Sequence, residues 1–241
     1  MEKQAPGRRQ LAAEASKERI LNAAEKLFSE QGLDGVSVRE IAGAAKLDVA
    51  MINYHFGSKL GLYRAVFHRR IDQLTEQRLG ELDEALARAG EQPRLRDVVH
   101  ALIAPNILLR SNRALGGVPF ARLIVREMTD PNERERGIIS EMFDPTAYRF
   151  MEAIAQIFPG APRAEIHWAY HFAIGTLVHA MASTGRLEYL SRGACAMSDP
   201  DVILARLVPF VESGFEGCLG HFRRRTASSE NAGSTAKLPA G

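Results

Sequence analysis

The apolar positions of this 241-residue chain recur every three or four residues along most of its length. This is the period of an amphipathic helix rather than of a strand. In the segment 16–31, for example, Ile20, Ala24, Leu27 and Phe28 fall on one face. No stretch alternates with period two for long enough to predict a strand. The pattern predicts an all-α protein, with helices at about 16–31, 37–45, 49–55, 58–88, 94–111, 119–129, 132–158, 163–185 and 200–223.

The elements that follow residue 37 are short and sharply bounded. Ser37 and Glu40 have the S-x-x-E spacing of a capping box at a helix start. Asp48 can cap the next helix, 49–55, and Gly57 can end it. Two short helices joined by a tight turn are typical of a helix-turn-helix, whose second helix reads DNA. The sequence therefore predicts an N-terminal three-helix DNA-binding domain with 49–55 as the recognition helix.

The side chains expected on the outside of that helix suit a major groove. Asn53 can pair with adenine, and Val49 or Ala50 can touch a thymine methyl group. Ser37 and Lys59 stand at helix starts, where backbone amides, the helix dipole and a cation can hold phosphates. The predicted DNA-binding set is Ser37, Lys46, Val49, Ala50, Asn53, Tyr54, His55 and Lys59.

These residues lie in a segment that resembles a known DNA-binding domain. The stretch "ILNAAEKLFSEQGLDGVSVREIAGAAKLDVAMINYHFGSKLGLYRAVF" is similar to that of the TetR family of transcriptional regulators. The likeness covers residues 16–67 and includes A-A-x-x-L-F-x-x-x-G, V-x-x-I-A-x-x-A and Y-H-F-x-S-K. It implies an all-α protein that dimerises through its C-terminal helices, binds a palindromic operator and holds a small molecule in its C-terminal domain.

Two positions depart from the family pattern, and a second segment resembles a subgroup. Asp48 stands where the family often has Ser, which makes a direct phosphate contact there unfavourable. Asn53 stands where the family often has Tyr, which shifts the expectation from phosphate contact toward base reading. The segment "LIVREMTDPNERERGIISEMFDPTAYRFMEAIAQIF" resembles the C-terminal domain of the CecR-like subgroup.

The pattern also predicts how the chain is divided. We expect a turn at 89–95, with the long helix 58–88 bridging the two units. Pro105 and Pro145 should kink or break the helices that contain them. The predicted divisions are a disordered arm at 1–15, the helix-turn-helix domain at 16–62, a larger C-terminal helical ligand-binding and dimerisation domain at 63–225, and a disordered tail at 226–241.

The C-terminal half offers candidates for dimerisation and ligand binding. Ile166 to Gly185 has no Asp, Glu, Lys or Arg, and a helix buried on nearly all sides, as in a dimer, explains this better than a membrane span. Helices 163–185 and 200–223 are therefore the predicted homodimer interface. A pocket for an apolar or aromatic effector is predicted from side chains of the middle helices, namely Arg122, Arg126, Met128, Phe143, Tyr148, Trp168 and His171.

Composition narrows the function classes only slightly. The net charge is +2, and residues 1–80 hold thirteen Lys and Arg against ten Asp and Glu. This mild basic bias is compatible with DNA. No signal peptide, P-loop or nucleophile–base set is visible, so we expect a cytoplasmic, non-enzymatic protein without a cofactor. His167 and His171 could share a metal, but the expected glutamate is missing, and polar contacts are the favoured interpretation.

The sequence predicts a ligand-responsive DNA-binding regulator, in the first place a repressor released from its operator by a small effector. An activator and an effector-independent DNA-binding protein are the alternatives with the same fold. Effector identity, operator sequence and assembly beyond a dimer are not encoded in any motif recognised above.

Overall fold

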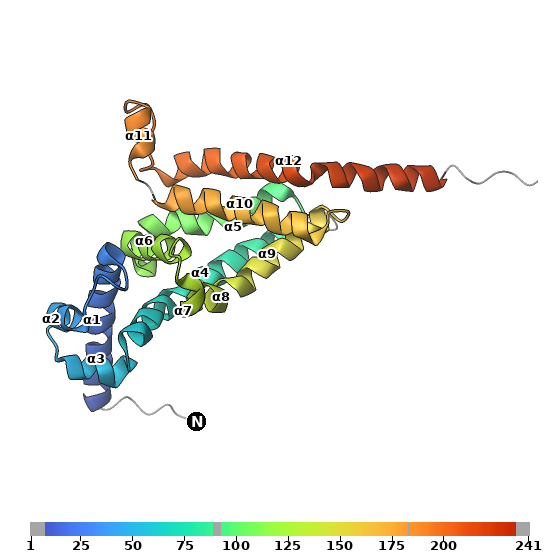
Figure 1. The fold of residues 1–241 in the computed structure, drawn as a ribbon. Coiled ribbons are helices and arrows are strands. Elements are labelled where there is room, and N and C mark those ends of the chain that lie inside the picture. Colours follow the sequence, from blue (N-terminus) through green and yellow to red (C-terminus); the bar gives the residue numbers. More distant parts are fainter. Residues whose placement is uncertain (1–7, 89–92, 183, 235–241) are drawn as a thin grey trace, which may run out of the picture.

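A computed structural model describes residues 8–88, 93–182 and 184–234, and all regular structure in these ranges is helical. Figure 1 shows two units that share the long helix α4. The all-α prediction is confirmed. The main helices are α1 (Arg8–Gln31), α2 (Val38–Ala45), α3 (Val49–Phe56), α4 (Lys59–Arg88), α5 (Leu95–Leu108), α6 (Gly117–Met128), α9 (Asp144–Ile157), α10 (Arg163–Ala182) and α12 (Pro200–Ser234).

The N-terminal unit packs α1, α2, α3 and the first turns of α4 around a small apolar core (Figure 1). Phe28 of α1 meets Tyr63 of α4 edge to face, with ring centroids 5.0 Å apart. Ile41 and Ile52 are completely buried and fix α2 and α3 to this core. The spacing that predicted the three-helix domain therefore corresponds to its buried faces.

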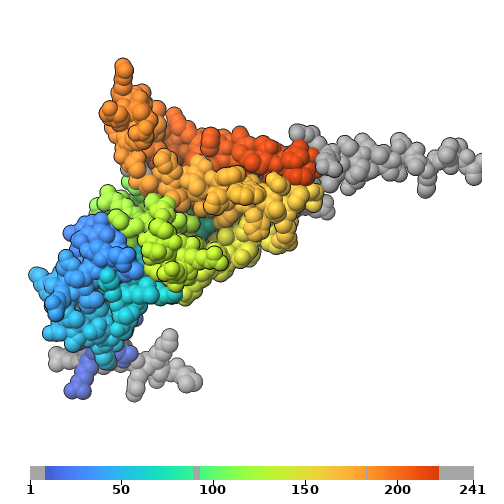
Figure 2. All heavy atoms as spheres, in the orientation of Figure 1, coloured from blue at the N-terminus to red at the C-terminus, as the bar shows by residue number. Residues whose placement is uncertain are grey.

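The C-terminal unit is a bundle in which α5 packs between α4 and α12, and α10 packs on α12, α6 and α9. The two last long helices, α10 and α12, lie side by side along one surface (Figures 1 and 2). The short helix α11 (Arg186–Leu190) projects from the bundle beside them. The sequence pattern did not predict α11, because it is one turn long and none of its residues is buried.

The predicted helix 132–158 is wrong as a single element. It consists of α7 (Glu133–Arg136), α8 (Ile138–Met142) and α9. Gly137 has φ +66°, a left-handed conformation that ends α7. Pro145 lies in the first turn of α9 rather than inside a helix, as its missing N–H favours. By contrast, α5 continues through Pro105 and tightens into the 3₁₀ turn η1 (Leu109–Ser111), which is followed by η2 (Arg113–Leu115).

Helices extend into both segments that the sequence predicted to be disordered. Helix α1 begins at Arg8, within the predicted arm, because Arg, Gln, Leu, Ala and Glu are strong helix formers. Helix α12 runs to Ser234, past the predicted start of the tail at residue 226. Extending an existing helix avoids the cost of nucleation, so small polar residues can follow it. Residues 1–7 and 235–241 of the predicted ends lie outside the described ranges, as do residues 89–92 of the predicted turn.

Candidate functional site

The short helix α3 is held at both ends by local hydrogen bonds. The Asp48 carboxylate accepts from the backbone N–H of Ala50 at 2.7 Å and caps the N-terminus. Gly57, at φ +71°, donates its backbone N–H to the Asn53 carbonyl at 2.9 Å and ends the helix. Asp48 is therefore occupied as a cap, which fits the expectation that it makes no phosphate contact.

The outer face of α3 exposes most of the side chains that the sequence assigned to DNA. Ala50, Asn53 and Tyr54 are exposed, Tyr54 to 79%. Val49, by contrast, is half-buried and packs against the core. His55 is also half-buried, and its Nε2 lies in the interior with no hydrogen-bond partner among the described residues. On α3 the exposed side chains are thus fewer than the residues that the sequence assigned to DNA.

The turn before α3 is fixed by an arginine that the sequence pattern did not reveal. Lys46 caps α2 in the left-handed region, with φ 54°, which is unusual for a residue with a side chain. Its side chain is exposed. Arg19 of α1 donates from Nη2 to the carbonyls of Ala45 and Lys46, at 2.5 and 3.0 Å. Arg19 therefore ties the turn to α1 and sets the angle between α2 and α3.

The two predicted phosphate ligands already have partners inside the protein. The Ser37 hydroxyl donates to the Glu40 carboxylate at 2.7 Å, within a complete capping box. This hydrogen bond and one from the Ser37 backbone lower the pKa of Glu40. Lys59 Nζ donates to the Val36 carbonyl at 3.1 Å, which joins α4 to the loop before α2. An ammonium has three donors, so Lys59 can still meet a phosphate, whereas Ser37 must turn away from Glu40 first.

A glycine brings α3 and α4 closer than a side chain would allow. A Cβ atom on Gly61 would lie 2.2 Å from the Phe56 carbonyl oxygen. Ser58 caps the same turn by accepting from the Gly61 N–H at 3.0 Å. The segment from Gly57 to Gly61 therefore ends the recognition helix, starts the supporting one and presses them together.

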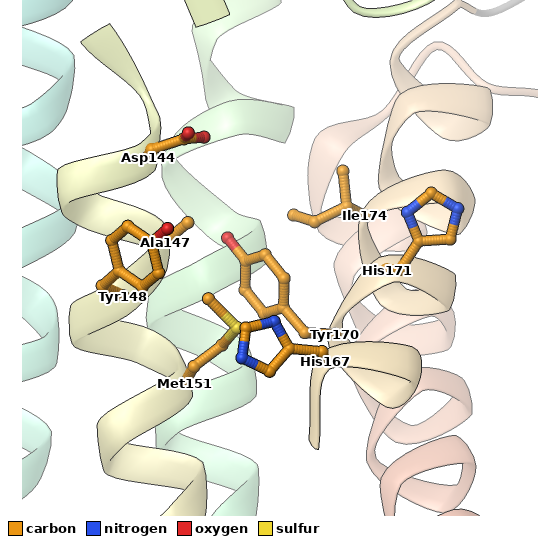
Figure 3. A pocket seen from close by; sticks show the side chains of 8 residues that line it. All are labelled: Asp144, Ala147, Tyr148, Met151, His167, Tyr170, His171 and Ile174. Atoms are coloured by element: carbon orange, nitrogen blue, oxygen red, sulfur yellow. The ribbon is translucent and has the colours of Figure 1, made fainter. Parts of the chain in front are cut away.

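Between α9 and α10 the C-terminal unit is hollowed by two adjoining cavities. The outer cavity, of about 270 Å³, is shown in Figure 3, where Tyr170 reaches from α10 toward Ala147 on α9. The inner cavity, of about 90 Å³, shares Asp144, Ala147, Tyr170 and Ile174 with the outer one. Its other lining residues come from α4, α5, α6, α8 and α10 and include Arg78, Asn106, Ile124, Met128, Ile139, Phe143 and Leu177.

The predicted pocket residues divide into three groups. Met128 and Phe143 line the inner cavity, and Tyr148 and His171 line the outer one. Trp168 is exposed and stacks on Phe172, beside His171 but not among the lining residues. The two arginines of α6 lie elsewhere. Arg122 is exposed, and Arg126 donates to the Glu30 carbonyl at 3.1 Å, so it joins α6 to α1.

The charged group that does reach the inner cavity is Arg78, which was not among the predicted pocket residues. Its position was readable, because Arg78 stands four residues from Leu74 and from Leu82 on the buried stripe of α4. It is only 4% exposed. The Tyr170 hydroxyl is its hydrogen-bond partner, and the Phe150 ring centroid lies 5.5 Å from its guanidinium carbon. Burial lowers the pKa of Arg78, and this effect outweighs the contact with Tyr170.

A second buried charge cluster joins the cavity wall to the DNA-binding unit. Glu127 of α6 is 1% exposed and accepts from the Tyr63 hydroxyl at 2.9 Å. It also accepts from Arg136 Nε and Nη2, both at 3.0 Å, and Arg136 lies 3.2 Å from Asp130. Burial raises the pKa of Tyr63, and the Glu127 carboxylate raises it further. Because Glu127 lies between the cavity residues Ile124 and Met128, its hydrogen bond with Tyr63 connects the cavity wall to the start of α4.

Surface-side ion pairs add further connections between α1 and α4. Glu25 of α1 accepts from Arg69 Nη2 at 2.5 Å and from Arg70 Nε at 3.2 Å. Arg70 also donates to the Ala114 carbonyl at 2.7 Å, in the segment that precedes α6. The N-terminal unit is thus held to α4 and α6 by directional contacts rather than by apolar packing alone.

Two family profiles match this chain, and they agree with its division into two units. Residues 20–66 match the profile described as "Bacterial regulatory proteins, tetR family", which covers part of α1, all of α2 and α3, and the start of α4. Residues 100–214 match "Tetracyclin repressor-like, C-terminal domain", which covers most of the lining of both cavities. The chain belongs to the TetR family of transcriptional regulators. The CecR-like subgroup stays a prediction, because neither profile names it.

Curated relatives of this TetR-family chain are regulators as well. It is 29% identical over 136 residues to the HTH-type transcriptional regulator AcrR of Shigella flexneri, which is 55% of this chain and 61% of AcrR. It is 38% identical over 66 residues to the HTH-type transcriptional repressor NicS of Pseudomonas putida, which is 27% of this chain and 31% of NicS. The matches thus span less than two thirds of these relatives.

Solved structures share the fold over nearly their whole length. FadR from Bacillus subtilis, solved in complex with stearoyl-CoA, has a TM-score of 0.61 at 16% identity, covering 82% of this chain and 98% of FadR. NalD of Pseudomonas aeruginosa, the secondary repressor of the MexAB-OprM multidrug efflux pump, has a TM-score of 0.55 at 23% identity, covering 85% and 97%. At these identities the likeness establishes the fold.

Two properties of the described ranges bear on other functions. Within them, no helix is both long and apolar enough to span a lipid bilayer. No three His, Cys, Asp or Glu side chains of those ranges gather as candidate metal ligands. His167 and His171 therefore have no third ligand there, and both line the outer cavity.

Proposed function

We propose that this TetR-family protein is a cytoplasmic homodimeric repressor that leaves a palindromic operator when a small effector occupies the cavities between α9 and α10. One observation carries the proposal. The inner cavity wall and the DNA-binding unit are joined by the buried cluster of Tyr63, Glu127 and Arg136. A ligand that displaces α6 changes the position of Glu127, and hence of α4 and of the recognition helix.

Dimerisation is supported by an uncovered apolar face on α10 and α12. Trp168 and Phe172 on α10 and Phe210 on α12 are all more than half exposed, Phe210 to 66%. Gly214 and Gly217 of α12 leave open space where a side chain would stand, so another helix can approach closely. A two-fold interface here would pair α10 and α12 with their copies as four helices.

The mechanism is a population shift. On operator DNA the two α3 helices would enter successive major grooves about 34–36 Å apart. The effector prefers a state in which α6 and α4 have moved, and this state does not fit that spacing. The effector can release DNA only to the extent that it binds the second state more tightly than the first.

The experiment is fluorescence anisotropy with DNA that flanks the gene, over a series of salt concentrations. We expect Asn53→Ala to reduce preference for one sequence over random DNA, because Asn53 is exposed on α3. Lys59→Ala should flatten the dependence of affinity on salt by about one phosphate contact. Arg149→Ala, an exposed cation of α9 far along the chain from α3, is the matched control and should keep the wild-type slope.

Two results would contradict this proposal. If the wild type binds all DNA sequences equally, it does not recognise a specific operator. If Asn53→Ala keeps the wild-type sequence preference, α3 is not the helix that reads the bases. Because Lys59 also contacts Val36, its variant should be checked by urea unfolding. Phe210→Glu tests the dimer separately, since a variant that remained a dimer in sedimentation would exclude the interface proposed here.

A further inference from the structure

The two cavities adjoin, and the inner one lies between the outer one and a buried cation. Asp144, Ala147, Tyr170 and Ile174 belong to the linings of both. The outer cavity opens between α9 and α10 (Figure 3), and Arg78 stands at the inner one. A ligand that enters beside His167 and passes Tyr170 would therefore reach the guanidinium group.

The inner site is unusual because its charge has no carboxylate partner. Among the ion pairs found in the described ranges, none includes Arg78, and its Nε has no hydrogen-bond partner there. Tyr170 and the Phe150 ring are weaker substitutes for an anion. A buried cation without a counterion is costly unless a charged partner arrives.

The rest of the inner lining is almost entirely apolar. Ile124, Met128, Phe143 and Leu177 surround the space. Asn106, a buried amide of the lining, donates one N–H to the Leu102 carbonyl at 2.9 Å and keeps its second N–H and its carbonyl oxygen. Asp144 lies on the wall shared by the two cavities. One negative charge is therefore favoured at Arg78, and a second one along the path is disfavoured.

We propose that the effector is a monocarboxylate with an apolar body, whose carboxylate pairs with Arg78. This inference rests on the proposed function for the consequence of binding, but not for the binding itself. A guanidinium can hold a carboxylate with two parallel hydrogen bonds. Since Arg78 can only donate to the Tyr170 oxygen, the Tyr170 hydroxyl proton remains available for the same carboxylate. The apolar body lies against Ile124 and Met128, next to Glu127, and so acts on the connection to α4.

The test uses two matched pairs of probes on the full-length protein. Octanoate and benzoate carry the carboxylate, and 1-octanol and benzyl alcohol keep the apolar body without the charge. Isothermal titration should detect binding of at least one carboxylate at least about tenfold tighter than its alcohol. Arg78→Met should reduce affinity for that carboxylate about tenfold to a hundredfold and leave the alcohol unchanged.

Two further variants distinguish a specific loss of carboxylate binding at Arg78 from a loss of the folded structure. Arg149→Met removes an exposed cation of α9 that is paired with Asp83, and it should bind the carboxylate like the wild type. Arg78→Met combined with Tyr170→Phe removes both polar partners, so it should remain folded while it loses the carboxylate preference. Thermal unfolding without probe verifies that each variant is folded.

Equal affinity of wild type for each carboxylate and its alcohol, or no binding of either carboxylate, would overturn the proposal. Unchanged carboxylate affinity in folded Arg78→Met would overturn it too. Operator anisotropy without probe is measured in parallel. If the protein binds the operator but no carboxylate, the proposed ligand class is wrong and the proposed DNA-binding function is retained. If the carboxylate binds through Arg78 but no operator is bound, the proposed function fails alone.

Discussion

Arg136 of α7 and Arg78 of α4 are both buried, but their surroundings are opposite. Arg136 pairs with Glu127 and Asp130. Burial alone would lower its pKa, but these carboxylates outweigh that effect and raise it. Arg78 has Tyr170 and Phe150 instead, and burial lowers its pKa. The buried charge in the region around Arg136 is thus paired. The region around Arg78 contains no ion pair to this guanidinium among the described residues, although Asp144 lines the same cavity. The first holds the DNA-binding unit in place, and the second is suited to receive a ligand.

Removing the carboxylate that pairs with Arg136 should have the largest effect on stability. Glu127→Gln leaves Arg136 largely buried with only the partly exposed Asp130 as its carboxylate partner. We expect the free energy of unfolding to fall by about 3–5 kcal/mol, because the buried guanidinium loses its fully buried carboxylate partner. Urea unfolding measures this. Glu141→Gln, which breaks the exposed pair with Arg64, is the control and should cost less than about 1 kcal/mol. Equal losses in the two variants would contradict the contrast.

The next largest effect should come from the contact between α3 and α4. Gly61→Ala forces a Cβ atom against the Phe56 carbonyl, so we expect a loss of about 1–3 kcal/mol. The angle of α3 should change too, which anisotropy would report as weaker operator binding. Gly80→Ala is the matched control on the same helix, because no atom of the surrounding structure lies within 4 Å of the place its new methyl group would occupy. It should be more stable than wild type by about 1 kcal/mol.

The folded state should tolerate the loss of the positive charge of Arg78. The double variant Arg78→Met, Tyr170→Phe removes a desolvated cation together with its hydroxyl partner. We expect its free energy of unfolding to stay within about 1 kcal/mol of the wild-type value. Urea unfolding without ligand is the measurement. A loss as large as that of Glu127→Gln would mean that Arg78 is a structural residue, and the two regions would then be alike.

The smallest effect concerns acid stability at the capping box of α2. Because its hydrogen bonds from Ser37 lower the pKa of Glu40, the box stabilises the folded state above the ordinary glutamate pKa. That contribution should be lost as the pH falls below about 4 and through the lowered pKa. Glu40→Gln should therefore show a flatter fall in stability there. Ser37→Ala should show part of this flattening, because its backbone N–H can still donate to Glu40. An unchanged pH dependence in both variants would exclude the box as its source.

The local pattern was sufficient for the DNA-binding unit. The Ser37 and Asp48 caps and the stop at Gly57 all depend on neighbours within four residues, and the structure has each of them. The resemblance to the TetR family was likewise carried by one continuous segment. The pattern did not predict the hydrogen bonds between residues that are distant in the sequence. Examples are those from Arg19 to the Ala45 carbonyl and from Lys59 to the Val36 carbonyl.

The sequence by itself determined the helical class, the order of most helices and the position of the recognition helix, because helix periodicity and capping are local. Only the tertiary structure decided which charges are buried and which have partners. Helix periodicity places Arg78 on the buried stripe of α4, but only the fold shows that Arg78 lines a cavity and that Arg126 joins α6 to α1. Glu127 and Tyr63 are 64 positions apart and meet only when α6 packs on α4. The cost of burying a charge depends on such distant partners, so the connection between cavity and DNA follows from the fold rather than from any motif.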